Sequence, residues 1–254
     1  MPSSLLVRPL LAALLLLSAC ATRPPASDPE ALAEYRENND PAEPTNRFFY
    51  RVNDGLDTYV LAPIARGYRY AVPGVVRRPV HNVLANLSSP IIFANDVLQT
   101  RPRRAGDTLM RFLINSTAGV GGLFDVASDL GFPQHDTDFG VTLALWGVGE
   151  GPFLFLPALG PSNPRDASGF AGNILLDPLT YATFGGVNTL RTVRTGVGIV
   201  DSRERVLDPV DNIKKTALDP YATFRSLYRQ NRQSTIDTTR DDRRATTPAW
   251  FSDR

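Results

Sequence analysis

The stretch Phe139–Asp166, FGVTLALWGVGEGPFLFLPALGPSNPRD, combines apolar and aromatic residues with glycine or proline every few positions. The wider segment 139–190 contains only four charged residues, Glu150, Arg165, Asp166 and Asp177, although 21% of the whole chain is charged. Because glycine and proline interrupt the apolar runs, none reaches the roughly 18 to 20 residues that a membrane-spanning helix needs. We therefore expect this region to lie in or along a bilayer without crossing it, and to handle lipid.

Charge is distributed unevenly along the chain. The 254 residues carry a formal net charge of only +1, so no overall electrostatic field favours binding to nucleic acid. Residues 191–254 nevertheless contain 22 charged side chains. The length permits one or two domains with a sizeable core. We expect the C-terminal end to face water and the charge-poor middle to face an apolar phase.

The N-terminus has the pattern of a bacterial export signal. Arg8 precedes the apolar run PLLAALLLL, which leads into Leu17-Ser18-Ala19-Cys20. A basic residue, a short apolar run and small residues at the cleavage site are typical of a secretory signal peptide. The tetrapeptide also resembles the bacterial lipobox, whose cysteine receives a diacylglycerol and then an acyl chain. The alternative is an ordinary signal peptide, which would leave Cys20, the only cysteine, as an unpaired thiol in an oxidising compartment.

The chain divides into four parts by composition. We expect a signal peptide in residues 1–19, an acylated N-terminus and flexible tether in 20–45, a folded body in 46–232, and a disordered polar tail in 233–254. Ala21 follows the cysteine where an aspartate would resemble the signal for retention at the inner membrane. By that resemblance the destination is the outer membrane, on its periplasmic leaflet.

The body is predicted to be mainly helical, with amphipathic helices broken by glycine and proline. Pro73-Gly74 is expected to end the segment that begins at Asn46. Apolar residues recur at close to helical spacing in 75–99, where Pro90 marks a break or a kink. Residues 190–206 have the pattern of a helix with a charged face, and Asp219 with Pro220 is placed to start a terminal amphipathic helix. Only Phe153–Leu156 has the pattern of a short extended strand.

Several residues are candidates for a lipid channel, each with a structural alternative. Gly121 and Gly122 are expected at turn and packing positions rather than in direct lipid contact. Asp125 either caps a turn or lines the passage. Trp146 and Phe153 suit either an interfacial aromatic belt or core packing. A further pair, Arg165 with Asp166, either forms an ion pair that fixes its loop or guides lipid headgroups, and we favour the ion pair.

Signals for enzyme chemistry or metal binding are weak. The two histidines, His81 and His135, do not have H-E-x-x-H spacing, and no cysteine is placed to complete a zinc site. A serine hydrolase would need His135 to lie within reach of Ser162 and Asp166, which nothing in the sequence implies. We expect no catalytic residue, no metal and no cofactor other than the covalent lipid at Cys20.

The chain resembles the MlaA (VacJ) family of outer-membrane lipoproteins over roughly residues 44–232. The motifs that carry the resemblance fall in the family's order: Asn46-Arg-Phe-Phe-Tyr50, Arg111-Phe-Leu-Ile-Asn115, Gly121-Gly-Leu-Phe-Asp-Val-Ala127, Trp146-Gly-Val-Gly-Glu-Gly-Pro152, Gly160-Pro-Ser-Asn-Pro-Arg-Asp166 and Leu218-Asp-Pro-Tyr221. One departure is Ala144, where the family pattern has glycine.

This resemblance implies a ring-like helical body that lies in one leaflet of the outer membrane and encloses an amphipathic channel. Family members remove misplaced phospholipid from the outer leaflet, work beside trimeric porins and pass lipid to a soluble periplasmic carrier, which maintains lipid asymmetry. Two other functions stay open from the residues alone. One is a structural lipoprotein that scaffolds envelope proteins, and the other is a membrane-bound lipid hydrolase.

Overall fold

The computed structural model describes residues 27–28, 30 and 38–241. Cys20, the signal peptide and residues 242–254 of the expected tail lie outside these residues. The elements follow one another in this order: α3 (Glu43–Leu56), the π-helical turn η1 (Asp57–Leu61), α4 (Ala62–Ala71), α5 (Gly74–Leu98), α6 (Pro102–Thr117), α7 (Val126–Asp129), α8 (Phe139–Leu145), β1 (Leu154–Leu156), β2 (Gly160–Ser162), α9 (Pro164–Leu176), η2 (Pro178–Thr180), α10 (Val187–Arg205), α11 (Leu207–Thr216) and α12 (Pro220–Arg240).

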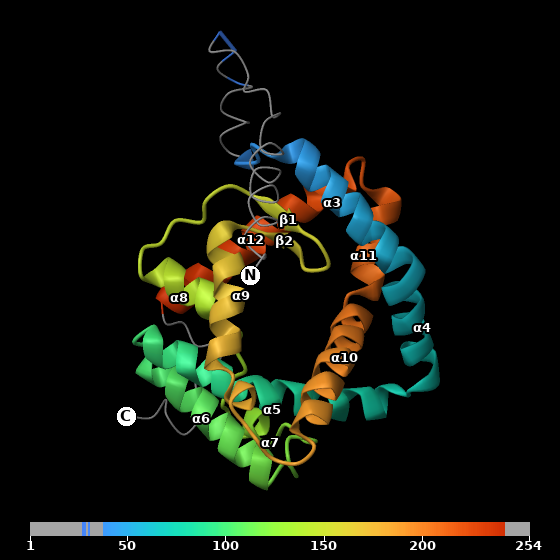
Figure 1. The fold of residues 1–254 in the computed structure, drawn as a ribbon. Helices are drawn as coiled ribbons and strands as arrows, with labels where there is room; N and C mark the ends of the chain where they lie inside the picture. Colours follow the sequence, from blue (N-terminus) through green and yellow to red (C-terminus); the bar gives the residue numbers. More distant parts are fainter. Residues whose placement is uncertain (1–26, 29, 31–37, 242–254) are drawn as a thin grey trace, which may run out of the picture.

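The helices are arranged as a ring around a central opening (Figure 1). Helices α3 and α4 form one side, α5 crosses below, α8 and α9 form the opposite side, and the β1–β2 hairpin with α12 closes the ring above. Helix α10 packs against α4 and α5 and runs along the inner side of the ring. Helix α6 packs on α5, and α8 packs on α9. The expectation of a mainly helical, ring-like body is confirmed.

Helix α6 buries its polar face and exposes its apolar one. Arg104, Asp107 and Arg111 are buried, whereas Leu109 and Leu113 are more than 40% exposed. The same inversion holds for the part of the chain that the structure describes, in which buried polar and charged residues outnumber buried apolar ones. A water-soluble domain shows the opposite preference. Large exposed apolar surface rimmed by polar residues marks an interaction site, such as contact with a membrane.

None of the described helices combines the length and the apolar content that crossing a bilayer requires.

Of the break or kink expected at Pro90, the break is wrong, because helix α5 continues through this residue. A proline within a helix cannot donate to the carbonyl one turn earlier and crowds that turn. The hydroxyls of Ser88 and Ser89 donate to the carbonyls of Leu84 and Ala85, at 3.0 and 3.3 Å. The carbonyl that Pro90 leaves without a backbone donor is that of Asn86, so these two bonds do not replace the missing one. The segment boundary expected at Pro73-Gly74 is confirmed, because α4 ends at Ala71 and α5 begins at Gly74.

The hairpin β1–β2 is short, and α3 supplies hydrogen-bonding partners for its β1 strand. Asn46 accepts a hydrogen bond from the Phe155 amide at 2.8 Å and donates to the Phe153 carbonyl at 3.0 Å. Two helical turns further along α3, Asn53 accepts a hydrogen bond from the Ala158 amide and donates one to the Leu156 carbonyl, each at 2.8 Å. An unpaired strand edge would otherwise leave these backbone groups without partners. The two asparagines therefore attach β1 to α3.

Phe153 is 2% exposed and lies in an aromatic cluster with Phe155 and Tyr221. Its ring makes edge contacts with both of them, with centroids 6.4 and 6.1 Å apart. The suggestion that Phe153 belongs to an interfacial belt is therefore wrong, and core packing is the correct alternative. Trp146, by contrast, is 56% exposed, and its indole N–H donates to the Leu98 carbonyl at 3.1 Å.

Both expected ends of the folded body need correction. The tether was expected to reach residue 45, but Asp40 is buried, accepts hydrogen bonds from Tyr221 and Asn46, and pairs with Arg225 at 2.8 Å. Disorder was expected from residue 233, but α12 runs to Arg240, and Thr239 on its last turn is buried. Asp40 lies in a charge-rich stretch of sequence, but its partner Arg225 lies 185 residues away, which local composition does not reveal.

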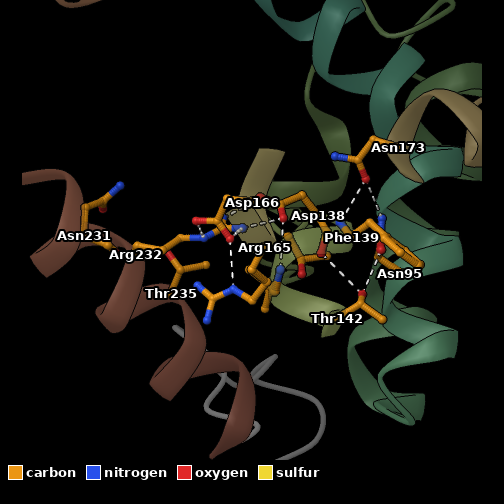
Figure 2. A network of polar contacts seen from close by, with 12 residues as sticks. Asn95, Asp138, Phe139, Thr142, Arg165, Asp166, Asn173, Asn231, Arg232 and Thr235 are labelled. Atoms are coloured by element: carbon orange, nitrogen blue, oxygen red, sulfur yellow. Dashed lines mark hydrogen bonds and ion pairs between the residues drawn. The ribbon is translucent and has the colours of Figure 1, made fainter. Parts of the chain in front are cut away.

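A network of ion pairs joins α12 to the starts of α8 and α9 (Figure 2). Arg232 on α12 contacts Asp138 at 2.5 Å and Asp166 at 2.8 Å. Asp138 also caps α8 by accepting from the Val141 amide, while Asp166 lies in the first turn of α9. Carboxylates at helix N-termini are favoured by the local backbone dipoles. A single arginine of α12 therefore fixes the N-terminal ends of α8 and α9 relative to each other.

Helices α8 and α9 approach so closely that their contact requires glycine. A Cβ atom built on Gly169 would lie 2.4 Å from the backbone nitrogen of Gly140 and 2.6 Å from its Cα. A Cβ on Gly172 would lie 2.3 Å from the Phe139 ring. The backbones are joined further by Asn173, which accepts from the Phe139 amide at 2.9 Å (Figure 2).

Replacing Gly169 with alanine should destabilise the protein by about 1–3 kcal/mol, because the new methyl group forces two backbones apart. The matched control is Gly106→Ala in α6, where a built Cβ meets no atom within 4 Å. That change should be neutral or stabilising by about 0.5–1 kcal/mol, since alanine favours helix over glycine. Urea unfolding of both variants in the same detergent measures the difference, and an equal stability of the two variants would contradict the close packing.

Replacing Asp166 with asparagine should lower the free energy of unfolding by about 2 kcal/mol at neutral pH. Burial raises the pKa of Asp166, but hydrogen bonds from Arg232 and Tyr228 outweigh it and hold the pKa below the ordinary value. A carboxyl group with a depressed pKa stabilises the folded state at neutral pH and loses this contribution as the pH falls below the unfolded-state pKa of about 4 and through the lower folded-state pKa. The wild-type protein should therefore lose more stability than Asp166→Asn between pH 5 and the acid limit. Unfolding curves at several pH values test this.

The control for that series is Asp237→Asn, whose carboxylate forms an exposed pair with Arg240 three residues on. Such pairs contribute about 0–1 kcal/mol. If Asp237→Asn and Asp166→Asn have the same pH dependence, the network around Arg232 does not hold the ring together.

Candidate functional site

A cavity of about 850 Å³ lies on the inner side of the ring. Helices α5 and α10 form two of its walls, Phe170 of α9 contributes a third, and the hairpin tip with Ala158 and Leu159 projects between them. Helix α10 is central to the arrangement in Figure 1, where it lies inside the ring opposite α9. The volume lies within the range of small-molecule binding sites.

Helix α10 presents one face to the cavity, and its sequence spacing explains why. Arg191, Arg194, Thr195, Gly198 and Ser202 line the wall and follow the three- and four-residue spacing that places side chains on one side of a helix. This is the segment that the sequence predicted as a helix with a charged face. Its charged face turns inward, toward the cavity, rather than outward to solvent.

The charged side chains of the wall are paired. Arg194 contacts Asp177 at 2.6 Å, and Arg191 donates to the carbonyls of Thr180 and Ala182 at 3.1 and 3.0 Å. Arg203 contacts Asp57 of η1 at 2.9 Å. Burial raises the pKa of Asp57, but hydrogen bonds from Arg203 and Lys214 lower it below its ordinary value, so this carboxylate stays ionised. The wall is thus polar without a large net charge.

Apolar side chains occupy the rest of the wall. Leu84 and Ile92 come from α5, Leu159 from the hairpin tip, Phe170 from α9 and Ile199 from α10. The lining therefore combines polar side chains, most of them on α10, with apolar side chains from α5, α9, α10 and the hairpin. A molecule with a charged head and a hydrocarbon tail finds partners for both parts in such a lining.

Asp125, one of the predicted candidates, lies elsewhere. Its carboxylate caps α7 by accepting from the Ser128 amide and binds Arg111 through both oxygens at 2.9 Å. Burial raises the pKa of Asp125, but hydrogen bonds from Ser128, Arg111 and Asn115 lower it below the ordinary value. It lines a separate small cavity of about 30 Å³ between α5 and α6. Of its two predicted roles, the structure supports the cap.

The other predicted candidates also lie outside the lining of the main cavity. Arg165 and Asp166 form an ion pair at 3.0 Å, as we favoured from the sequence, and Asp166 belongs to the Arg232 network. Gly121 and Gly122 have positive φ angles of 70° and 92° in the turn after α6, and a Cβ on Gly122 would lie 2.7 Å from Asn86. These glycines occupy turn and packing positions.

Sequence reasoning missed the residues that do line the cavity, notably Arg191, Arg194 and Asp201 on α10 and His81 and Ser88 on α5. The helical spacing of charged residues in 190–206 was the signal that could have found those on α10. It was interpreted as a solvated face, because a charged stripe alone does not say whether it faces solvent or a polar cavity.

The histidines are placed beside carboxylates. His81 Nδ1 lies 3.1 Å from Asp201, and His135 Nε2 lies 2.9 Å from Asp96. The Ser162 hydroxyl donates to the Asn163 carbonyl, and the contacts of His135 are with Asp96 and Thr108. Nothing therefore joins Ser162 to His135. In the described ranges no group of three or more histidine, cysteine or acidic residues could hold a metal ion.

Comparisons with known proteins identify a matching family and several similar chains. The family model of the MlaA lipoprotein matches residues 38–235. The chain is 32% identical to the intermembrane phospholipid transport system lipoprotein MlaA of Haemophilus influenzae, over 87% of this chain and 88% of that protein. It is 32% identical to the protein of the same name from Escherichia coli, over 76% of each chain. An uncharacterized protein of Rickettsia bellii is 37% identical over 79% of this chain and 78% of its own.

A solved structure agrees with the fold. It was described as the structural basis for maintenance of bacterial outer membrane lipid asymmetry, and it matches with a TM-score of 0.68 and 31% sequence identity. The match covers 78% of this chain and 98% of the solved one. The family model starts at residue 38, close to the buried Asp40 and well before the domain boundary expected from composition. On these matches, and with its helical ring and inverted helix faces, the chain belongs to the MlaA lipoprotein family.

Proposed function

We propose that this protein carries phospholipid through its central cavity as a component of intermembrane phospholipid transport, and thereby maintains the lipid asymmetry of the outer membrane. The observation that carries the proposal is the cavity of about 850 Å³, lined by both polar and apolar side chains, in a ring that exposes many large apolar side chains. The names of the family relatives support the same assignment.

The physical problem that such a cavity addresses is the movement of a lipid headgroup past hydrocarbon. Burying an unpaired charge or an unsatisfied polar group in an apolar phase is costly. The polar face of α10 offers the headgroup hydrogen-bonding partners, while Leu84, Ile92 and Phe170 face the acyl chains. A passage of this kind lowers the barrier without an energy source in the protein itself, and the direction of flow then depends on the component that removes the lipid.

The proposal includes the anchor and the partners. Cys20 carries a diacylglycerol and an acyl chain, which hold the protein on the periplasmic leaflet of the outer membrane, because each buried methylene contributes about 0.8 kcal/mol. Lipid enters from the outer leaflet beside a trimeric porin and leaves to a soluble periplasmic carrier. The outward apolar side chains of α6, such as Leu109 and Leu113, support placement of the ring within one lipid layer.

The experiment is to fill the cavity from α10. Gly198 lines the cavity and a Cβ built on it meets no atom within 4 Å, so Gly198→Trp should fold and obstruct the passage. In cells that lack the chromosomal copy, this variant should leave as much phospholipid on the cell surface as the deletion does. Surface phospholipid is measured by labelling intact cells.

The matched control is Gly196→Trp, which lies two residues away, outside the lining of the cavity, and is equally unobstructed. It should restore wild-type surface phospholipid. If Gly198→Trp is present at wild-type abundance and also restores it, transport through this cavity is refuted. That outcome would favour the scaffold function, which needs the outer surface and not the passage.

A further inference from the structure

A second cavity, of about 400 Å³, adjoins the first near the N-terminal end of α5 and the C-terminal end of α10. Its lining includes three arginines, Arg77, Arg78 and Arg205. It shares His81 and Asp201 with the central cavity, so the two spaces are neighbours along the same helices. We call this second space the arginine pocket.

The carboxylates of the arginine pocket already have cationic or histidine partners. Glu204 is contacted by Arg77 and, at 2.8 Å, by Arg69. Asp201 lies 3.1 Å from His81. The side chain of Glu204 is only 9% exposed, so its charge is enclosed by these two arginines. Among the described residues, no ion pair joins either carboxylate to Arg78 or Arg205.

Two arginines of the pocket keep their charge available. Arg205 contacts the His81 ring, with its Nη1 at 2.8 Å from Nδ1 and 2.5 Å from Nε2. Within the described chain, Arg78 forms no ion pair or hydrogen bond, and both side chains are exposed. In addition, the Nε atom of Arg77 is buried and has no hydrogen-bond partner among these residues. Three guanidinium groups therefore have donors that no protein acceptor uses.

Guanidinium groups with unused donors favour an anionic ligand such as a phosphate group. Arginine has only donors, arranged in a planar fork that matches the oxygens of a phosphate group. The contact with His81 restricts Arg205, which reduces the entropy lost when a ligand binds. The geometry therefore suits a phosphate oxygen cluster.

We propose that the arginine pocket binds the phosphate of a phospholipid headgroup while the acyl chains lie in the central cavity. The proposal rests on the transport function proposed above and assigns a headgroup site to it. The lipid, rather than free phosphate, is indicated because apolar residues of the central cavity, Leu84 and Ile199 among them, lie on the same two helices within about one turn of His81 and Asp201. Arg78 and Arg205 would hold the phosphate, and His81 would position Arg205.

The test compares binding by the mature, acylated lipoprotein in detergent micelles, using isothermal titration calorimetry. The probes are dihexanoylphosphatidylethanolamine, dihexanoylglycerol, which lacks the phosphate, and inorganic phosphate. The main variant is Arg78→Gln with Arg205→Gln. The control is Arg51→Gln with Lys215→Gln, which removes two exposed cations that lie outside the pocket and form no hydrogen bond or ion pair within the described chain.

The phosphatidylethanolamine should bind about tenfold more weakly to the Arg78→Gln, Arg205→Gln variant than to the wild type, because charge-assisted bonds to phosphate are lost. The control variant should bind it like the wild type, and dihexanoylglycerol should bind equally to all three proteins. Arg78→Lys with Arg205→Lys should fall between, since lysine keeps the charge but not the fork. Unchanged unfolding temperatures confirm that each variant is folded.

The outcomes separate this inference from the transport function. If the wild type binds the phospholipid and the double glutamine variant binds it equally well, the pocket assignment is wrong and transport is untouched. Inorganic phosphate that binds as tightly as the lipid, and only when both arginines are present, would make this a site for free anions and overturn the lipid assignment. A wild-type protein that binds neither lipid probe contradicts the transport function itself.

Discussion

Polar contacts between helices, rather than a continuous apolar core, hold this ring together. Arg232 joins the starts of α8 and α9, Arg225 joins α12 to Asp40, and Arg203 joins α10 to Asp57 in η1. In a lipid environment apolar surfaces gain little by leaving the solvent, so packing and hydrogen bonds must specify how helices meet. Breaking one partner of a buried pair is costly, whereas the intact pair adds little net stability. These pairs therefore act chiefly to fix one arrangement of the helices.

The same constraint explains why the cavity is both open and polar. Many of the polar side chains are buried in pairs between helices, and large apolar side chains are exposed on α3, α4, α6 and α9. The inner face of α10 carries the charged residues of the cavity wall, which are neutralised by partners in other segments, such as Asp177 for Arg194. A ring built in this way can enclose a cavity of about 850 Å³.

Much of the fold could be predicted from the sequence, and the reasons are local. The Asp219 cap and Pro220 of α12, the boundary at Pro73-Gly74 and the short strand at Leu154–Leu156 follow from propensities of a few neighbouring residues. The ion pair of Arg165 with Asp166 was also visible, because the residues are adjacent. The family could be identified from motifs in their expected order, and the resemblance to that family implied the ring shape.

What the sequence could not reveal depends on contacts between distant segments. The burial of Asp40 needs Arg225, and the helical state of residues 233–240 needs a surface for Ile236 and Thr239. Phe153 is indistinguishable in sequence from an interfacial aromatic until Tyr221 is placed beside it. The cavity was missed for the same reason, because the charged stripe of α10 indicates a polar neighbour but does not identify it. The candidate channel residues were chosen because they lie in the family motifs. In this structure several of those motif residues form turns and helix caps and do not line the central cavity.

The central claim is that the outer face of the ring meets hydrocarbon while its inner face meets water and headgroups. Spin labels attached at Leu113, on the exposed face of α6, and at Thr195, in the wall of the cavity, test it in the acylated protein reconstituted into a bilayer. The label at residue 113 should collide mainly with dissolved oxygen, which concentrates in hydrocarbon, and the label at 195 mainly with a water-soluble nickel chelate. Equal access of the nickel chelate to both positions would contradict the account.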